Sequence, residues 1–192
     1  MRVFGLPLRS VVALAILLFP LELRAAILST TGAIVVATPP SDIQTGAWES
    51  NTTIEAFAEL QNVLVTDPVS VDITKPGTSP GATSQNLSSG TINAGSTVDS
   101  YFLHFDAVGE PDDQNAVSAS GSITFSSNIV GIAIFKTTLD ATDPIFGLPG
   151  VSYATGQTER GLEITPGQFG TMSNDEITLS ADLRTVTLDL SG

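Results

Sequence analysis

Gly95-Ser-Thr-Val-Asp-Ser-Tyr-Phe-Leu-His-Phe-Asp106 is the stretch that decides the fold. From residue 101 onwards its side chains alternate between two faces, as they do in a β-strand. The first face carries three large apolar side chains, those of Tyr101, Leu103 and Phe105. The second face carries a mixed set, Phe102, His104 and Asp106. Gly95 and Gly109 break regular structure at either end. The stretch therefore predicts a strand whose first face joins the core, while its second face lies near water or a second packed layer.

Apolar runs predict further strands on both sides of this stretch. They cover residues 33–37, 69–73, 119–125, 161–164, 176–179 and 185–190, together with the nearly continuous run 129–135, which is typical of a strand buried on both faces. Residues 48–65 fit either a helix or a strand, and a strand is favoured because no capping signal opens a helix. Many short strands with Gly- and Pro-rich connections predict an all-β fold, a two-sheet antiparallel β-sandwich of jelly-roll type.

Long connections are expected between these strands. Three segments are predicted to be loops, residues 75–86, 110–115 and 144–161. Residues 138–143 are expected to form a turn or a single helical turn. The sequence has no Asn-Gly or Asp-Gly pair, which favours longer connections over two-residue hairpins.

Residues 1–25 have the pattern of a secretory signal peptide. Arg2 and Arg9 accompany an unbroken apolar run, residues 11–19, which is shorter than the ~20 residues that a membrane-spanning helix needs. Cleavage is expected after Ala25 or Ala26. Residues 26–192 are then predicted to form a single domain, secreted by a bacterium and without a membrane anchor.

The chain is strongly acidic, with 20 acidic and 7 basic residues and a formal net charge of −13. Residues 1–25 hold three of the basic residues and one of the acidic ones, so the remainder carries −15. Proteins bind nucleic acids and anionic lipids mainly through Lys and Arg, so neither is expected as a partner. The sequence has no cysteine, which suits a bacterial exported protein of a size that folds without disulfides.

His104 is the only histidine in the chain. Histidine is a common general base and metal ligand. One histidine without cysteine does not build a His-rich zinc site, although carboxylates can complete a mixed one. We expect His104 to be a strand residue that hydrogen-bonds to a neighbouring carboxylate or carbonyl oxygen.

Two patterns resemble catalytic motifs. Gly77-Thr78-Ser79-Pro80-Gly81 matches the G-x-S-x-G pattern of serine hydrolases, but no apolar helix follows the serine, so the match is attributed to chance. Paired carboxylates can serve a glycosidase. The pairs Glu55/Glu59 and Asp140/Asp143 stand out, and both are expected to be solvated surface.

Calcium is the cofactor for which the sequence offers candidate ligands. Calcium takes six to eight oxygen ligands from carboxylates and loop carbonyls. The loop Asp112-Asp113-Gln114-Asn115 and the turn that holds Asp140 and Asp143 supply such oxygens. Neither has the spacing of an EF-hand, and the alternative for both is an acidic, solvated loop.

Several segments of the chain carry a family resemblance. They are residues 48–51 (Trp-Glu-Ser-Asn), 57–61 (Phe-Ala-Glu-Leu-Gln), 95–106, 121–125 (Gly-Ser-Ile-Thr-Phe), 139–143 (Leu-Asp-Ala-Thr-Asp), 147–150 (Gly-Leu-Pro-Gly) with Tyr153, and 160–163 (Arg-Gly-Leu-Glu). The set resembles the exported proteins of PEP-CTERM type found in biofilm-forming and environmental bacteria. Val98 to Asp106 is its specific part.

The resemblance implies export and an association with extracellular polysaccharide, and it supplies no catalytic residues. Proteins of this type usually end in a Pro-Glu-Pro sorting signal, an apolar helix and a basic tail. The present sequence stops at Ser191-Gly192. We therefore expect either a protein that is released rather than anchored, or a shortened sequence.

The leading hypothesis is a secreted, non-enzymatic extracellular matrix or surface protein that binds polysaccharide through loops at one end of the sandwich. A self-assembling structural exoprotein is the first alternative. A carbohydrate-active hydrolase or lyase is the second, with Glu59, Asp106 and Glu163 as its candidate carboxylates.

Overall fold

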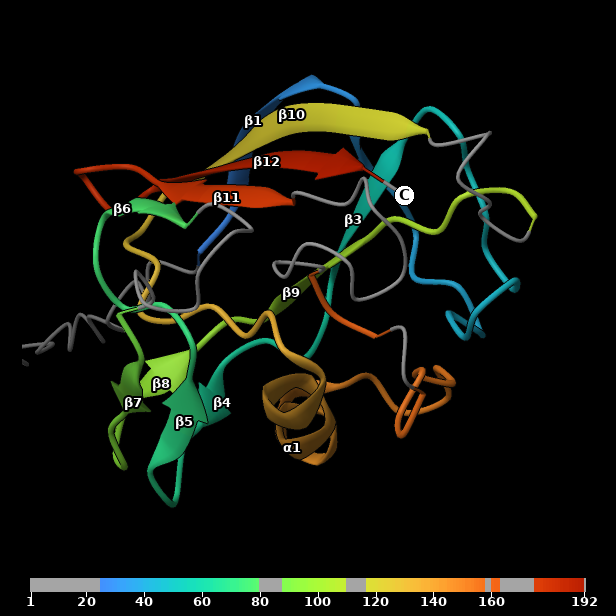
Figure 1. The fold of residues 1–192 in the computed structure, drawn as a ribbon. Helices are drawn as coiled ribbons and strands as arrows, with labels where there is room; N and C mark the ends of the chain where they lie inside the picture. The colour runs from blue at the N-terminus through green and yellow to red at the C-terminus, as the bar shows by residue number, and fades with distance from the viewer. Residues whose placement is uncertain (1–24, 80–87, 110–116, 158–159, 163–174, 192) are drawn as a thin grey trace, which may run out of the picture.

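The structure is a computed structural model, and it describes residues 25–79, 88–109, 117–157, 160–162 and 175–191. Its strands are β1 (Ile27–Gly32), β2 (Ile34–Val36), β3 (Ile54–Ala58), β4 (Val63–Leu64), β5 (Val69–Val71), β6 (Gly77–Ser79), β7 (Gly90–Ile92), β8 (Thr97–Val98), β9 (Tyr101–His104), β10 (Ser118–Phe125), β11 (Glu176–Leu179) and β12 (Thr185–Ser191). The helix α1 (Lys136–Phe146) lies between β10 and β11 in the sequence. In Figure 1 the longest strands form an upper layer, and α1 lies below with the smallest strands.

The upper layer is a five-stranded antiparallel sheet with the order β1-β10-β12-β11-β6. The predicted alternation in its two longest strands is confirmed. Ala119, Ile123 and Phe125 of β10 are buried. So are Val186, Leu188 and Leu190 of β12. One face of the sheet therefore belongs to the core, and the other faces solvent.

A pair of glycines lets β1 approach β10 closely. Gly32 and Gly121 lie opposite each other in the ladder. Gly32 has a φ of 64°, and a Cβ atom there would collide with the carbonyl oxygen of Ser120. A Cβ on Gly121 would collide with the carbonyl oxygen of Thr31 and crowd the side chain of Ile34. Only glycine fits both positions without moving the backbone.

The second layer is a three-stranded sheet with the order β2-β3-β9. The predicted strand at residue 101 is β9, and β3 confirms a strand within residues 48–65. The apolar face of the predicted strand, Tyr101, Leu103 and Phe105, packs on the main core cluster as expected. That cluster also holds Ile54 and Ala56 of β3 and Leu188 of β12, so the core lies between the two sheets. The parallel pairing of β2 with β3 was not predicted.

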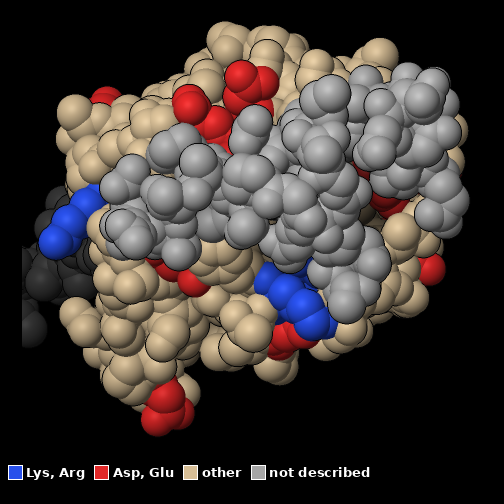
Figure 2. All heavy atoms as spheres, viewed as in Figure 1, with Lys and Arg blue, Asp and Glu red and all other residues tan. Residues whose placement is uncertain are grey.

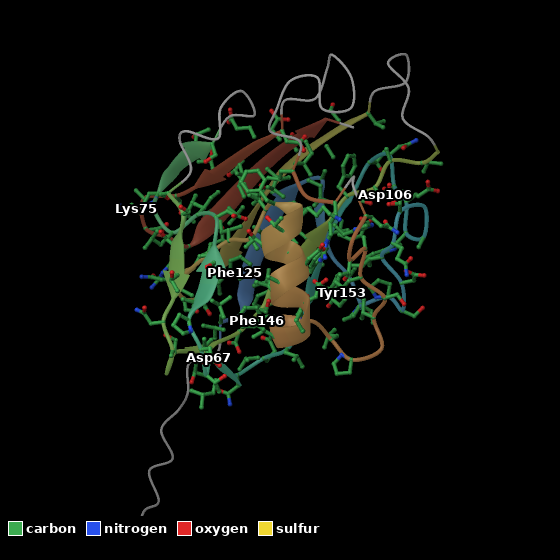
Figure 3. All side chains as sticks on the ribbon, turned by 60° about the horizontal axis from the view of Figure 1, so that its bottom comes forward. Asp67, Lys75, Asp106, Phe125, Phe146 and Tyr153 are labelled. Atoms are coloured by element: carbon green, nitrogen blue, oxygen red, sulfur yellow. The ribbon has the colours of Figure 1, made fainter. Side chains whose placement is uncertain are left out.

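Two small antiparallel sheets, β4–β8 and β5–β7, complete the lower part of the molecule. Val69 and Val71 of β5 are buried with Ile92 of β7 and Phe146 of α1 in a second core cluster. In Figure 3, α1 lies in front of the strands, with Phe146 near one end. The half-buried strand predicted at residues 69–73 is confirmed as β5, and its buried side packs against α1.

Two predicted segments differ from the structure. Residues 129–135 do not form a continuous strand, and their β-type pairing is limited to two isolated bridges, Ile132 with Ile73 and Phe135 with Gly161. The predicted loop 75–86 contains β6, the edge strand beside β11. Both errors have the same cause, because strand formation depends on a distant partner that no local pattern reveals.

Residues 136–146 form a helix where the sequence predicted at most one helical turn. The segment has three threonines and a proline, Pro144, which are poor helix formers. Contacts from elsewhere in the chain compensate. The buried carboxylate of Asp72 accepts hydrogen bonds from the backbone N–H groups of Ile134 and Phe135 and from the hydroxyl of Thr138. Tertiary contacts, rather than local propensity, therefore start the helix.

The all-β class is confirmed, with a sandwich-like arrangement of largely antiparallel sheets around one main core. Within the described residues no helix has the length and apolar character to cross a membrane. The predicted signal peptide falls almost entirely on residues 1–24, which lie outside the described residues.

Candidate functional site

The solvent face of the five-stranded sheet carries a row of hydroxyl side chains, one from each strand. The ladder registers place them side by side in the order Thr31 (β1), Ser122 (β10), Thr187 (β12), Thr178 (β11) and Thr78 (β6). Neighbouring strands lie about 4.8 Å apart, so the row crosses roughly 19 Å of the surface. We call these five residues the hydroxyl row.

Hydrogen bonds between its members hold parts of the hydroxyl row in place. The hydroxyls of Ser122 and Thr187 lie 2.8 Å apart, and those of Thr78 and Thr178 also lie 2.8 Å apart. In a neighbouring row on the same face, the hydroxyls of Thr124 and Thr185 lie 3.0 Å apart. Each hydroxyl has one donor hydrogen and two acceptor lone pairs, so capacity for an external partner remains after such a bond.

None of the five members of the hydroxyl row is charged, although carboxylates lie in one of the rows beside it. The next transverse row on the same face contains Ser120, Asp189 and Glu176, which places two carboxylates at one side. On the other side lie Ser29, Thr124 and Thr185. In a chain with 20 acidic residues, a neutral row of five is a distinct surface.

Figure 2 shows lysine and arginine side chains at only two places in its view, one of them beside acidic groups.

The outer face of β3 and β9 carries an aromatic layer. Phe57 and Phe102 stack with ring centroids 5.6 Å apart. Tyr153 meets Phe102 edge-on at 5.6 Å, and Trp48 lies 6.1 Å from Phe57. Such contacts are typical of packed aromatic clusters. The face of β9 that carries Phe102 and His104 therefore meets a second packed layer, which is one of the two surroundings predicted for it.

His104 lies in β9 and hydrogen-bonds to a carbonyl oxygen, as its sequence context predicted. Its ring stacks on Trp48, with centroids 5.5 Å apart, and Nε2 lies 3.0 Å from the carbonyl oxygen of Trp48. A carbonyl only accepts hydrogen bonds, so Nε2 carries a hydrogen and donates it. Burial lowers the pKa of His104 below its ordinary value, against the opposing influence of the Trp48 carbonyl and the carboxylates of Asp106 and Glu55. The histidine is therefore largely neutral near pH 7.

Glu55 and Glu59 are buried, so the expectation of solvated surface was wrong for this pair. Glu59 accepts hydrogen bonds from the hydroxyls of Ser100, at 2.6 Å, and Tyr153, at 2.7 Å. Burial raises the pKa of Glu59 despite these two bonds. Glu55 accepts a bond from Thr53, and its buried Oε2 atom has no partner among the described residues.

Asp140 and Asp143 are held by Arg160. The Nη1 atom of Arg160 donates to Asp140 at 2.6 Å, and Nη2 donates to Asp143 at 2.6 Å. Lys136 lies 3.7 Å from Asp140. Burial acts to raise the pKa of Asp140, but the hydrogen bond and charge of Arg160 bring it below its ordinary value. A calcium ion at this pair would compete with a bidentate partner that is already present.

The remaining predicted residues divide between described and undescribed parts of the chain. Asp112, Asp113 and Glu163 lie outside the described residues. Ser79 is buried in β6, and no nucleophile elbow is formed at residues 77–79. Asp106 accepts a hydrogen bond from the backbone N–H of Gly46 at 2.7 Å. In the described ranges, no group of three or more His, Asp and Glu side chains is arranged to hold a metal.

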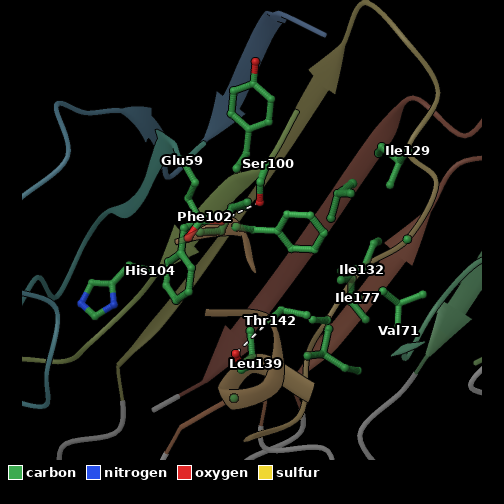
Figure 4. Close-up of a pocket in the computed structure, with 18 of the residues that line it drawn as sticks. Glu59, Val71, Ser100, Phe102, His104, Ile129, Ile132, Leu139, Thr142 and Ile177 are labelled. Atoms are coloured by element: carbon green, nitrogen blue, oxygen red, sulfur yellow. Dashed lines mark hydrogen bonds between the residues drawn. The ribbon is translucent and has the colours of Figure 1, made fainter. Parts of the chain in front are cut away.

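A cavity of about 570 Å³ lies between the two main sheets and α1. Its lining is largely apolar and includes Val71, Ile132, Leu139 and Ile177, as Figure 4 shows. Glu59, Ser100, Thr142 and Arg160 supply polar groups to the same lining. The volume is in the range of small-molecule sites.

Comparisons with protein-family models, curated proteins and solved structures found no match. The assignment of function therefore rests on the geometry of the chain itself. Sequence reasoning missed the hydroxyl row and the cavity. The alternation of Ser120, Ser122 and Thr124 with buried residues was the available signal for the row, although only the strand order places its five members together.

Proposed function

We propose that this protein is an exported, non-enzymatic extracellular protein that associates with neutral polysaccharide through the solvent face of its five-stranded sheet. The observation that carries this proposal is the hydroxyl row, Thr31-Ser122-Thr187-Thr178-Thr78, which crosses all five strands without a charged member.

The chemistry of the row favours a hydroxylated, uncharged partner. Serine and threonine hydroxyls donate and accept hydrogen bonds, as sugar hydroxyls do. An extended polysaccharide repeats its hydroxyls along the chain, so it can follow a straight row of the same groups. The acidic character of the protein opposes anionic polysaccharides through like-charge repulsion. A neutral polysaccharide is therefore the expected partner.

The surroundings of the described carboxylates support a non-enzymatic role. Glycoside hydrolysis uses one carboxylic acid and one carboxylate on either side of the scissile bond. Glu59 is bonded to Ser100 and Tyr153, and Asp143 is bonded to Arg160. These partners fix the carboxyl groups in the interior of the fold. The signal-like residues 1–25 and the resemblance to PEP-CTERM exported proteins favour a place outside the cell.

Retention of the purified chain on insoluble neutral polysaccharide, such as cellulose, tests the proposal. Thr187 lies at the centre of the row, so Thr187→Lys puts a bulky charge into the contact. Thr91→Lys is the matched control, because Thr91 is an exposed strand threonine in the small sheet β5–β7. We expect retention of the unaltered chain and of T91K, with loss of most retention in T187K. Equal retention of the two variants, or no retention of the unaltered chain on any neutral polysaccharide, would refute it.

A further inference from the structure

The cavity between the sheets runs along the free edge of β9. Among the described strands, β9 pairs with β3 alone, so it ends its sheet. Every residue from 97 to 106 lines the cavity, which means that both faces of the strand border it. A space that meets both faces of an edge strand lies beside its edge. Residues 127–134 line the other side, where Figure 4 shows Ile129 and Ile132 across the cavity from Phe102.

The ladder with β3 determines which backbone groups of β9 face the cavity. The N–H of Glu59 donates to the carbonyl oxygen of Ser100 at 2.9 Å. Hydrogen-bonded pairs alternate along an antiparallel ladder, so the next residue of β9 bonded to β3 is Phe102. The N–H and C=O groups of Tyr101 and Leu103 therefore point away from β3, towards the cavity. Outside that ladder, no backbone hydrogen bond among the described residues uses either of them.

Tyr101 and Leu103 are also accessible from the cavity. Both are half-buried, although their side chains pack on the main core cluster. Ala56, which lies opposite Leu103 in β3, is fully buried. The cavity is thus the uncovered side of β9. An edge strand with free N–H and C=O groups is a template for pairing with another extended segment.

The side chains around this edge favour an apolar segment. Ile177 and Leu188 line the cavity from the five-stranded sheet, and Leu139 lines it from α1. A segment placed beside β9 would have apolar neighbours on both of its faces. Strands that are buried on both faces are nearly continuous apolar runs, so such a run is the expected centre of the partner.

The charges of the lining favour basic residues at the ends of that segment. Of the described residues that line the cavity, Glu59, Asp99, Asp106 and Asp143 are acidic, and Arg160 is basic. Arg160 is already bonded to Asp143. Asp99 precedes β9 and Asp106 follows it, so carboxylates lie near both ends of the free edge. Lysine or arginine residues on either side of the apolar run complement these carboxylates.

We infer that the cavity is a strand-addition site, in which an extended apolar segment of a partner protein, flanked by basic residues, pairs with the free edge of β9. This site is independent of the hydroxyl row, because the cavity lies on the opposite, buried side of the five-stranded sheet. The strand β9 has 4 residues and spans about 14 Å, so a run of about four extended residues covers its edge.

Fluorescence anisotropy with a synthetic peptide and the purified full chain tests the inference. The probe is a dansyl-labelled, C-terminally amidated hexapeptide in which two lysines flank two valines and two isoleucines. One matched peptide is N-methylated on every aliphatic residue, which removes the N–H donors and keeps the side chains. A second has glutamates in place of the lysines. We expect each matched peptide to bind at least about tenfold more weakly than the probe, because it lacks the backbone hydrogen bonds or the complementary charge.

Amide hydrogen exchange locates the pairing in the unaltered chain. The N–H groups of Tyr101 and Leu103 are expected to exchange at least about tenfold more slowly when the probe peptide is bound, because the added strand accepts their hydrogen bonds. The N–H of Phe102 is the internal control, since it already donates to β3 and should change little.

Two variants of the chain give an independent location. Leu139→Trp adds volume at the α1 side of the cavity, and we expect it to weaken probe binding about tenfold or more while unfolding stays cooperative. Leu64→Ser is the control for adsorption to apolar surface, because Leu64 is exposed and does not line the cavity. It should bind the probe as the unaltered chain does.

Several results would overturn the inference. Equal binding of the N-methylated peptide and the probe would mean an apolar cavity without strand pairing, and equal binding of the glutamate peptide would remove the charge argument. Probe binding that L64S abolishes and L139W preserves would be adsorption elsewhere. Unchanged exchange at Tyr101 and Leu103, or no probe binding at millimolar peptide, would leave the edge without this partner. Concentration-dependent protection of both amides in the absence of peptide would assign the edge to a second copy of this chain instead.

Discussion

His104 lies flat on Trp48, with ring planes 8° apart, and donates a hydrogen bond to the backbone carbonyl of the same residue. The two contacts join β9 to the chain that precedes β3, across 56 residues of sequence. A protonated imidazole is disfavoured there, because burial lowers the pKa of His104. Protonation of the only histidine therefore opposes folding.

Stability should consequently fall as the pH drops from 7.5 to 5. In the unfolded chain the imidazole titrates near the ordinary value of 6.5, and in the folded chain it titrates lower. The unfolded state thus binds more protons in this window, and the free energy of unfolding decreases with decreasing pH. Urea unfolding of the unaltered chain and of His104→Gln at several pH values measures the effect. A smaller decrease in H104Q is expected, and an identical decrease would contradict the assignment.

Glu59 should contribute to the pH dependence of the free energy of unfolding with the opposite sign. Burial raises its pKa in the folded chain above the ordinary value of 4.5, so the folded state binds the additional proton as the pH falls towards 4.5. This contribution increases the free energy of unfolding on acidification. Glu59→Gln removes it, and the same urea series should show a steeper loss of stability in E59Q than in the unaltered chain. A shallower loss would mean that Glu59 is not the group with the raised pKa.

The Arg160 cluster should be a major source of stability for α1. Removal of one partner from a buried ion pair costs about 3–5 kcal/mol, because it leaves uncompensated charge. Arg160→Met leaves Asp140 and Asp143 facing each other and is expected to lower the free energy of unfolding by about 3 kcal/mol or more. Lys136→Met, which removes the more exposed contacts of Nζ to Asp140 and to the carbonyl oxygen of Gln157, is the control and should cost less than R160M. Equal costs for R160M and K136M would contradict this ranking.

The glycine pair of β1 and β10 should tolerate no side chain. Gly121→Ala places a methyl group against the carbonyl of Thr31 and the side chain of Ile34, an overpacking that costs about 1–3 kcal/mol. Gly46→Ala is the control for backbone strain alone, since Gly46 has a φ of +77° and no atom near the added methyl group. It should cost about 1 kcal/mol. Thermal unfolding compares the two variants, and a larger loss in G46A would contradict the close approach of the strands.

The sequence offers two candidate calcium sites, and variants can test them separately. Arg160 already binds Asp140 and Asp143, so a calcium-dependent rise in the unfolding midpoint is expected to depend on Asp112 and Asp113 instead. Circular dichroism with and without millimolar calcium should show the rise preserved in Asp140→Asn and lost in Asp112→Asn. Loss of the rise in D140N alone would assign calcium to the helix.

The structural features that follow from local alternation were predicted from the sequence. The features that depend on residues far away in the chain were missed. The faces of β9, β10 and β12 follow from a period of two, which each strand carries in its own residues. The helix α1 was missed because Asp72, which holds its first turn, is more than 60 residues away. Glu59 was taken for a surface residue because Ser100 and Tyr153, the partners that allow its burial, are 41 and 94 residues away.

The same distinction applies to the candidate sites. The sequence predicted that His104, as the only histidine, hydrogen-bonds to a carboxylate or carbonyl oxygen, and the carbonyl of Trp48 is that partner. The hydroxyl row needs the strand order β1-β10-β12-β11-β6, which brings residues 31 and 78 to opposite ends of one line. The cavity needs the packing of two sheets and a helix, and no sequence pattern marks it.

The most direct measurement is methyl NMR of the threonines during titration with a soluble neutral oligosaccharide. Binding at the solvent face of the five-stranded sheet predicts chemical-shift changes in the methyl groups of Thr31, Thr78, Thr178 and Thr187, while the buried Thr142 of α1 stays unchanged. Constant shifts of all four face methyls at millimolar oligosaccharide, or changes confined to threonines outside the sheet, would contradict the role proposed for the hydroxyl row.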